Sequence, residues 1–239
     1  MGLNIVDYLS YLNETDVVVF TENLNTPITD NVINIEQDWD EVNRTYEKEK
    51  IVILDNFLNP EFANRLRHFK LSINRYHGMY DGGYVNLDYQ RNGLWFPILE
   101  KLVQDCESYI PFLNVREFVR GWSFLYEYEC EGVNIHSDYE SVNLNMWVTP
   151  TESLLDLDTH NGLDIWKVYP PSDWDQDKSN SDEDSIFAFL QEMGVDSFKI
   201  KYAYNRAVLF DSKFFHKTQG ARSLHEWKHK RINYTMMWK

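Results

Sequence analysis

Three residues of this sequence have side-chain types and spacing that suit a metal ion: His136, Asp138 and His216. Two imidazoles and one carboxylate form the 2-His-1-carboxylate facial triad, which holds non-haem Fe(II) and leaves coordination positions open. On a β-strand, the side chains of His136 and Asp138 would project from the same face and reach one ion. The sequence therefore predicts a mononuclear iron site, with His216 as the third ligand.

The segments that must position these residues have the pattern of antiparallel β structure. From Val115 onward, apolar residues recur with a period of two, and turn residues separate short runs. Strands are expected at about 117–129, 132–138, 142–149, 163–169, 197–204, 206–211 and 231–238. Because no helix follows each strand, the pattern indicates a sandwich or jelly roll. Residues 115–239 are thus predicted to form a mostly β, jelly-roll metal core.

Residues 51–114 are predicted to be a helical support region for this core. Asn59 suits an N-cap and Pro60 the first helical position, ahead of an amphipathic face. That face consists of Phe62, Leu66 and Phe69. A second helix is expected at about 96–109, after a turn at Gly82–Gly83. Residues 1–50 are an extension of unclear structure, in which Val17–Phe20 has the composition of a short buried strand. The chain is expected to be one domain, 1–239.

An acidic insertion at about 172–197 interrupts the core strands. It is rich in Asp, Ser and Asn up to Ser185, and it continues into a short helix that Gly194 ends. Acidic runs are usually solvated surface, but this one lies between strands of the core. An active-site lid is therefore an open alternative.

Several short stretches carry a resemblance to a known family: Gly132–Asp138, Val142–Pro150, Gly162–Trp166, Asn205–Ser212, Phe215–His216 and Arg231–Thr235. They resemble the core of the Fe(II)/2-oxoglutarate-dependent oxygenase superfamily and, more narrowly, a bacterial group of 2-oxoglutarate-Fe(II) oxygenases of uncharacterised activity. A weaker match, Ile51–Pro60, is similar to the usual lead-in of such domains. The resemblance implies a double-stranded β-helix, Fe(II), 2-oxoglutarate as cosubstrate, and hydroxylation of a C–H bond with release of succinate and CO2.

The resemblance also implies where 2-oxoglutarate binds. In the superfamily, an Arg or Lys on the strand after the second histidine usually holds the distal carboxylate, often in an R-x-S motif. Arg231 occupies that place here, and Asn233 stands where a hydroxyl residue is common. A planar guanidinium suits bidentate binding of a carboxylate. Arg206 is the rival cation, although it begins a strand and could pair with an acid instead.

Further cofactor-binding candidates are Asn143 and Asn145, which alternate with apolar residues on one predicted strand. Two amides on one strand face can hydrogen-bond a cosubstrate or orient a ligand, and the alternative is a face that looks at water. Tyr126, on the preceding strand, could donate its phenol to the same pocket, as could Tyr128. Trp122, Trp147 and Trp166 could line the substrate side or simply pack in the core.

The composition narrows the class of partner. Lys and Arg number 23 and Asp and Glu number 38, which gives 23 − 38 = −15 and disfavours a nucleic-acid backbone as partner. A small-molecule or peptide substrate, together with O2, is expected. Without a basic leader or an apolar run long enough to span a membrane, the cytoplasm is the expected location and no membrane partner is expected. The sequence does not indicate an oligomeric state.

Other function classes stay open at this point. One is a catalytically inactive jelly roll that binds a ligand or a partner. Another is a cupin-type metalloenzyme, which typically has an H-x-H pair and a glutamate, a set we do not find in the sequence. His225 and His229 have the i, i+4 spacing of a metal pair on a helix, but they lie in a polar segment typical of a solvated loop. Within the superfamily, halogenating members lack the carboxylate that Asp138 provides.

Overall fold

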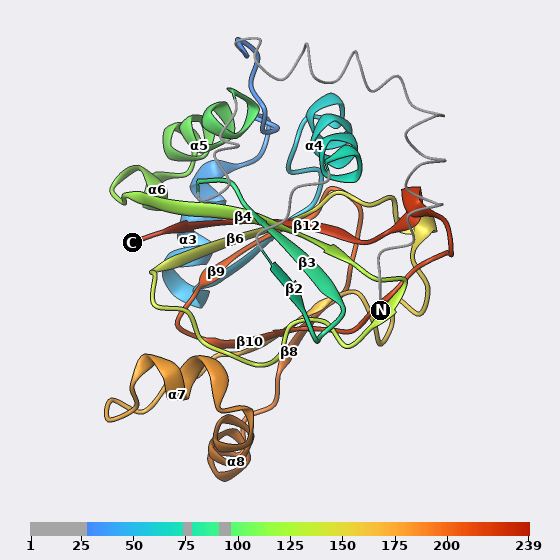
Figure 1. Cartoon of the computed structure of the whole chain (residues 1–239). Coiled ribbons are helices and arrows are strands. Elements are labelled where there is room, and N and C mark those ends of the chain that lie inside the picture. Colours follow the sequence, from blue (N-terminus) through green and yellow to red (C-terminus); the bar gives the residue numbers. More distant parts are fainter. Residues whose placement is uncertain (1–27, 74–77, 91–96) are drawn as a thin grey trace.

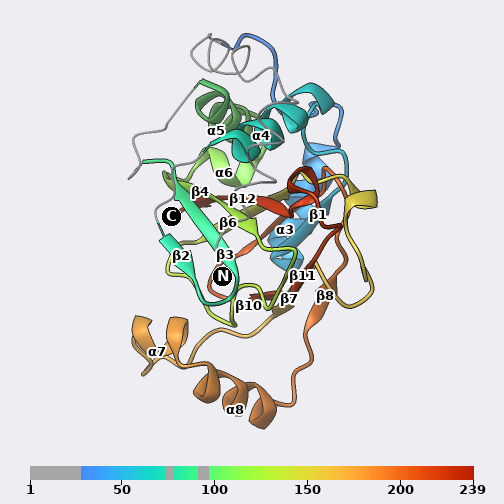
Figure 2. The ribbon, with the colours of Figure 1, turned by 45° about the vertical axis from the view of Figure 1, so that its right-hand side comes forward.

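The computed structural model describes residues 28–73, 78–90 and 97–239. A layer of helices covers one side of a large antiparallel sheet, and a smaller sheet lies on the other side (Figure 1). A helical insertion projects beyond the smaller sheet, as the turned view also shows (Figure 2). The expected strand at Val17–Phe20 lies outside the described residues.

The strands in chain order are β1 (Ile51–Leu54), β2 (Gly78–Tyr80), β3 (Tyr84–Asp88), β4 (Phe118–Tyr126), β5 (Glu129–Cys130), β6 (Val142–Trp147), β7 (Leu163–Trp166), β8 (Phe198–Ile200), β9 (Ala207–Asp211), β10 (Phe215–Thr218), β11 (Ala221–Arg222) and β12 (Ile232–Trp238). The helices are α3 (Trp39–Glu49), α4 (Pro60–Ser72), α5 (Pro97–Tyr109), α6 (Pro111–Asn114), α7 (Gln176–Ser181) and α8 (Glu183–Met193). Two 3-10 turns, η1 (Thr151–Ser153) and η2 (Trp227–His229), complete the described elements.

The large sheet has the order β1-β9-β6-β12-β4-β3-β2, with antiparallel pairing between all neighbours. The smaller sheet has the order β10-β7-β8, and β11 pairs with β5. Side chains of both sheets meet in one buried cluster, where Trp147 and Phe210 of the large sheet pack with Ile165 of the smaller one. Two facing antiparallel sheets of this kind form a jelly roll, so the predicted fold class is confirmed.

The period of two along β6 and β12 separates an apolar face from a polar one. Leu144 and Met146 on β6, with Tyr234 on β12, belong to the large apolar core that also includes residues of α4 and α5. The alternate residues face the interior between the sheets, and Asn145 lies opposite Thr235 there. Because the helices cover the apolar face, the polar residues of both strands are buried inside the barrel.

The helices of residues 51–114 lie mostly where the sequence predicted them. Helix α4 begins at Pro60 and buries Phe62, Leu66 and Phe69, and α5 spans most of the second predicted helix. Asn59 is the N-cap residue, as predicted, but its side chain makes no capping hydrogen bond and donates to the Asn31 carbonyl oxygen instead, at 2.5 Å. Helix α3 has no counterpart among the predicted elements.

The largest error concerns residues 132–138, which were expected to form a strand. In the structure they are an irregular loop with a single bridge between His136 and His216. Gly132 has φ +85°, and the backbone N–H groups of Ser137 and Asp138 donate to the carbonyl oxygens of Ser179 and Ser212. Ser179 lies in α7 and Ser212 lies directly after β9, so no continuous ladder can form. We call residues 132–138 the ligand loop.

Strand ends also differ from the prediction. The expected strand 117–129 is split into β4, which pairs with β3 and β12, and β5, which pairs with β11. The expected strand at 197–204 shortens to β8. The hairpin of β2 and β3 was anticipated only through its turn at Gly82–Gly83. Helix α8 ends at Gly194 in the left-handed conformation, as predicted, and α7 precedes it within the acidic insertion.

Gly132 supports the start of the ligand loop, and we expect its replacement by alanine to be costly. A Cβ atom there would lie 2.8 Å from the Thr218 carbonyl oxygen, at a positive φ. Backbone strain alone costs on the order of 1–3 kcal/mol. Thermal unfolding of Gly132→Ala should show a lower midpoint, with weaker metal binding because the loop carries His136.

Gly194→Ala is the matched control for this variant. Gly194 also has a positive φ, of +63°, but a Cβ atom there would have no neighbour within 4 Å. We expect a smaller loss, of about 1 kcal/mol, and unchanged metal binding. Equal losses in the two variants would contradict the role of the close approach at Gly132.

Candidate metal centre

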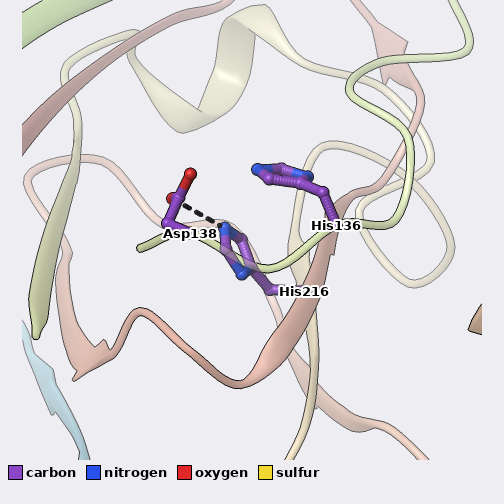
Figure 3. A group of neighbouring side chains, drawn as sticks. All are labelled: His136, Asp138 and His216. Atoms are coloured by element: carbon purple, nitrogen blue, oxygen red, sulfur yellow. Dashed lines mark ion pairs between the residues drawn. The ribbon is translucent and has the colours of Figure 1, made fainter. Parts of the chain in front are cut away.

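His136, Asp138 and His216 converge from two segments far apart in the sequence. His136 and Asp138 lie on the ligand loop, and His216 lies on β10 (Figure 3). The backbones of the two histidines hydrogen-bond each other in both directions, at 3.0 and 2.8 Å. One potential ligand atom from each side chain lies within 4.8 Å of the others, and among the residues that the structure describes this is the one such group of His, Cys, Asp or Glu.

Both imidazoles are oriented by backbone carbonyl groups. His136 Nδ1 lies 2.7 Å from the Asn134 oxygen, and His216 Nδ1 lies 2.9 Å from the Phe214 oxygen. A carbonyl oxygen only accepts, so each Nδ1 carries a proton, and in a neutral ring Nε2 then keeps the lone pair that a metal needs. His216 Nε2 lies 3.5 Å from Asp138 Oδ2, an oxygen that is buried without a hydrogen bond. This is the arrangement that metal-binding histidines commonly have.

The protonation states also suit a cation. Burial, together with neighbouring His216, lowers the pKa of His136 to about 4 against the opposing effect of Asp138, so the ring is neutral. Burial acts to raise the pKa of Asp138, but His216, His136 and Arg120 outweigh it and the pKa is lowered. A neutral imidazole and an ionised carboxylate are the forms that bind metal.

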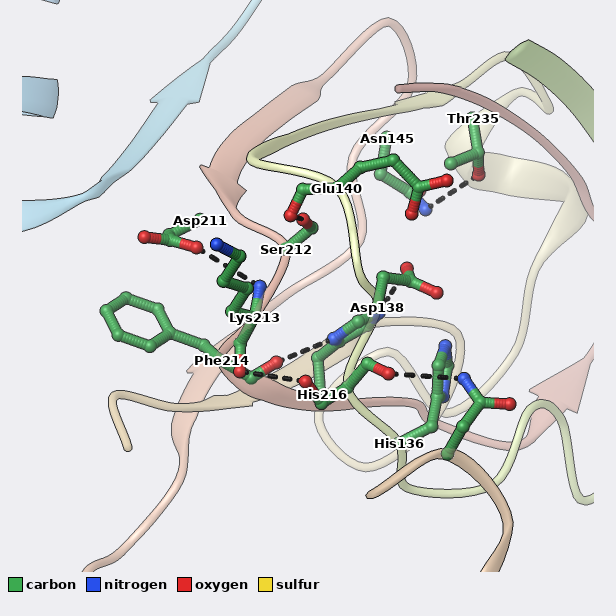
Figure 4. Close-up of polar contacts among 12 residues, drawn as sticks. His136, Asp138, Glu140, Asn145, Asp211, Ser212, Lys213, Phe214, His216 and Thr235 are labelled. Carbon is green, nitrogen blue, oxygen red and sulfur yellow. Dashed lines mark hydrogen bonds and ion pairs between the residues drawn. The ribbon is translucent and has the colours of Figure 1, made fainter. Parts of the chain in front are cut away.

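Ser137, between the two loop ligands, holds the loop in place. Its N–H donates to the Ser179 carbonyl oxygen at 2.9 Å, and the Asn180 amide donates to its carbonyl oxygen at 3.2 Å. Its hydroxyl donates to the Lys213 oxygen, and Asp138 N–H donates to the Ser212 oxygen, near the centre of Figure 4. The acidic insertion, through α7, therefore contacts the ligand loop directly.

Arg231 lies immediately before β12, with its side chain inside the barrel and 1% exposed. Its Nε donates to the Asn161 carbonyl oxygen at 3.0 Å, while one terminal nitrogen is buried without a partner. The guanidinium lies 4.4 Å from the Tyr126 ring centre and 5.8 Å from that of Tyr202. No acid among the described residues forms an ion pair with it. A buried, unpaired guanidinium is costly, so this arrangement suits an anionic ligand.

The three asparagines predicted to bind cofactor all lie in the interior, but their surroundings differ. Asn143 is 2% exposed, and its amide oxygen has no hydrogen bond. The oxygen of Asn233 is likewise unpaired. Asn145, in contrast, accepts from Trp147 Nε1 at 2.7 Å and donates to Thr235 at 3.3 Å. Asn143 and Asn233 can therefore contact a ligand, whereas Asn145 is engaged by protein groups.

The remaining candidates lie elsewhere. Arg206 forms a bidentate ion pair with Asp55, at 2.6 and 2.9 Å, which is the alternative expected for it. His229 contacts Ser153 and His225 stacks on Tyr128, so these histidines do not form a metal pair. Of the three tryptophans, Trp147 is buried and stacks on Tyr202, whereas Trp166 is partly buried and packs against the cluster that includes residues of α8.

Trp122 alone of these tryptophans lines the cavity of about 470 Å³ that also contains His136 and Asp138. The cavity includes residues that the sequence analysis did not identify, among them Tyr84, Asn86, Asp88, Arg120, Phe124 and Asn180. Arg120 forms an ion pair with Glu140 at 3.2 Å and stacks over Trp122. Because alternate residues of a strand share a face, Trp122 on β4 could have pointed to Arg120. Tyr84, Asn86 and Asp88 could not be found in this way, because β3 was not predicted as a strand.

No protein-family model matches the sequence, and no curated protein matches it. Solved structures do match. The non-haem α-ketoglutarate-dependent carbocyclase SnoK from nogalamycin biosynthesis aligns with 90% of this chain and 87% of its own, with a TM-score of 0.61 and 11% identity. HygX from Streptomyces hygroscopicus, solved with nickel, 2-oxoglutarate and hygromycin B, aligns over 86% and 87%, with a TM-score of 0.55 and 7% identity.

A Pseudomonas putida prolyl-4-hydroxylase aligns with 84% of this chain and 98% of its own, with a TM-score of 0.53 and 10% identity. At such low identities the likeness establishes the fold. The chain has the jelly-roll fold of the Fe(II)/2-oxoglutarate-dependent oxygenases, in agreement with the resemblance in its motifs. In the part of the chain that the structure describes, no helix has the length and apolar character needed to span a bilayer.

Proposed function

We propose that the protein is an Fe(II)- and 2-oxoglutarate-dependent dioxygenase that hydroxylates a C–H bond of a small molecule or peptide. In this reaction 2-oxoglutarate, O2 and the substrate R–H give succinate, CO2 and R–OH. The observation that carries the proposal is the convergence of His136, Asp138 and His216, with both Nε2 lone pairs free. The fold of the oxygenases above supports it.

His136, Asp138 and His216 are the proposed ligands of the iron. The donor set fits a ferrous ion, because the unpaired Asp138 oxygen and two neutral imidazoles offer one anionic and two neutral ligands. Ferrous iron bound there supplies the activation of O2 that drives oxidation of the keto acid. The protein's own part is to hold these ligands, orient the substrate and exclude bulk water.

Arg231 is the proposed anchor for the distal carboxylate of 2-oxoglutarate. Its burial and its lack of an acidic partner support this role, because a carboxylate would neutralise the guanidinium and accept from its unpaired nitrogen. The phenol of Tyr126, whose pKa burial raises, stays protonated beside it and can donate. Asn143 and Asn233 are proposed to contact the same ligand through their amide nitrogens, because 2-oxoglutarate offers only acceptors and the unpaired atoms of both side chains are oxygens.

The substrate would enter through the cavity next to His136 and Asp138. Its volume of about 470 Å³ lies in the range of small-molecule sites. HygX, which shares the fold, was solved with the small molecule hygromycin B, which supports a small molecule ahead of a peptide. The retained carboxylate of Asp138 supports hydroxylation over halogenation.

The decisive experiment measures succinate formed from 2-oxoglutarate by the purified protein with Fe(II), ascorbate and O2, with candidate small molecules added in turn. We expect slow basal formation that a true substrate stimulates. An absence of metal binding together with an absence of succinate would instead support a catalytically inactive jelly roll that binds a ligand or partner.

A further inference from the structure

Two neighbouring strands, β3 and β4, supply much of the lining of the cavity that contains His136 and Asp138. Alternate residues of a strand share a face, and two such sets line the cavity: Tyr84, Asn86 and Asp88 on β3, and Arg120, Trp122 and Phe124 on β4. In the register of the two strands, Asn86 lies opposite Phe124, and Asp88 lies opposite Trp122. Each of these two aromatic rings thus has a polar residue as its cross-strand neighbour.

The aromatic rings of this lining form a row that continues onto β2. The ring centre of Tyr84 lies 4.8 Å from that of Tyr80 and 4.8 Å from that of Phe124. The ring centre of Phe124 lies 6.4 Å from that of Trp122. Tyr80 is 40% exposed and Trp122 is partly buried, so the row leads from the surface into the cavity. Because the face of an aromatic ring is negative, it attracts the C–H hydrogens of a saturated ring.

The same residues also carry polar atoms that have no hydrogen-bond partner among the described residues: Asn86 Oδ1, Trp122 Nε1 and Arg120 Nε. Indole and guanidinium N–H groups only donate, whereas an amide oxygen accepts. Unpaired buried groups are unfavourable, so they favour a ligand that pairs with both kinds. A hydroxyl group donates and accepts. Turning the Asn86 amide would exchange its oxygen for its nitrogen, and a hydroxyl group suits either atom.

The charges of the cavity disfavour an acidic ligand. Among the described residues that line it, Arg120 is the one Arg or Lys, and it already forms an ion pair with Glu140. Asp81 and Asp88 line the cavity as well, in addition to the proposed iron ligand Asp138. A phosphate or carboxylate group of a substrate would therefore lie near like charges, which is unfavourable. The ligand that suits this site is uncharged or basic.

A second cavity, of about 810 Å³, adjoins the first and extends the surface that a ligand can contact. The two cavities share four lining residues, which are Tyr80, Asp81, Gly82 and Tyr84. The rest of the second lining includes three glutamates and one arginine, so it also disfavours an acidic ligand. A ligand of more than one ring can therefore occupy both cavities.

We propose that the substrate is a sugar or a glycoside without acidic groups. Its ring lies against the aromatic row, and its hydroxyl groups donate to Asn86 and accept from Trp122 and Arg120. A sugar combines a saturated ring with several hydroxyl groups, which matches both the rings and the unpaired atoms. A flat apolar molecule would leave those atoms unpaired, and an acidic one would meet the aspartates. This inference rests on the proposed function and names the substrate class of the same site.

The first experiment measures binding without turnover, by saturation-transfer NMR on the protein loaded with Ni(II) and 2-oxoglutarate. The probes are glucose, galactose, mannose, glucosamine, maltose and sucrose, and the sugar that binds best is then compared with its own phosphate ester and uronic acid. We expect at least one of the six to bind, and both acidic derivatives to bind at least about tenfold more weakly. Absence of binding by all six, or tighter binding of an acidic derivative, would overturn the proposal.

Trp122→Phe tests the placement of the sugar, because it keeps an aromatic ring and removes the indole N–H. We expect it to bind that sugar roughly three- to tenfold more weakly, with unchanged affinity for Ni(II) and 2-oxoglutarate. Trp166→Phe is the matched control, since Trp166 is partly buried and packs near α8, and it should bind as the wild type.

Asn86→Leu removes the amide at similar size and should weaken sugar binding to a similar extent, so it replaces Trp122→Phe if that variant does not fold. Wild-type affinity for the sugar in the variant that folds would overturn the proposal. Failure of the wild-type protein itself to bind Ni(II) with 2-oxoglutarate would instead reject the proposed function.

Discussion

Asp138→Ala is expected to bind Fe(II) at least about a hundredfold more weakly than the wild type and to form no detectable succinate. The variant leaves two neutral imidazoles and removes the only anionic member of the group. Loss of residues that merely orient metal ligands commonly costs ten- to a hundredfold in affinity, so loss of a ligand should cost more. Anaerobic titration with Fe(II) or Co(II) measures the effect.

The same variant separates loss of metal from loss of fold. The lowered pKa of Asp138 means that the folded protein favours its ionised form, so its removal should lower the stability of the metal-free protein modestly without preventing folding. Metal should raise the unfolding midpoint of the wild type, by an amount equivalent to about 2.7 kcal/mol at a concentration 100 times the dissociation constant. The same concentration of metal should leave the unfolding midpoint of Asp138→Ala unchanged. Asp173→Ala, an exposed acid of the insertion, is the matched control and should behave as the wild type. Equal metal affinity in all three proteins would refute the assignment of the ligands.

Arg231→Ala is expected to weaken 2-oxoglutarate binding by roughly ten- to a hundredfold while iron affinity stays the same. The guanidinium is buried and lacks an acidic partner, so the carboxylate would lose its charge-assisted hydrogen bonds. Spectroscopic titration of the iron-loaded protein with 2-oxoglutarate gives the affinity. Steady-state measurements should show a raised KM for 2-oxoglutarate that high concentrations partly overcome.

Arg206→Ala provides the matched control, because Arg206 is the other arginine considered from the sequence. Its guanidinium is occupied by Asp55, so its removal should lower stability modestly and leave the KM for 2-oxoglutarate unchanged. A raised KM in Arg206→Ala, with a normal one in Arg231→Ala, would move the anchor to the other arginine.

The type and spacing of the ligand residues were sufficient to predict which side chains converge, but not how they are held. His136 and Asp138 were placed on a strand because alternating positions share a face. The structure instead holds them in a loop whose partners, Ser179 and Ser212, are distant in sequence. Contacts of a loop with a helix and with a second loop leave no local pattern in the sequence, so neither the ligand loop nor its support by α7 could be predicted.

The polar residues inside the barrel were likewise predicted only in part: their positions followed from the sequence, but their hydrogen-bond partners did not. The period of two placed Asn143 and Asn145 on one face, which the structure confirms. Their different roles depend on the cross-strand register that brings Thr235 beside Asn145, and one strand alone does not specify its register. Helix α3 was missed because the segment is polar overall, although Trp39, Val42 and Tyr46 have the i, i+3, i+7 spacing of an amphipathic face.

Each imidazole is oriented by a carbonyl group two residues earlier in its own segment, Asn134 for His136 and Phe214 for His216. The orienting group and the oriented ring thus belong to one self-contained tripeptide in both cases. Other side chains that line the cavity, such as Tyr84 on β3 and Phe124 on β4, take no part in this arrangement. Substitutions of these cavity-lining residues can therefore change which molecule binds, while both imidazoles keep their orientation.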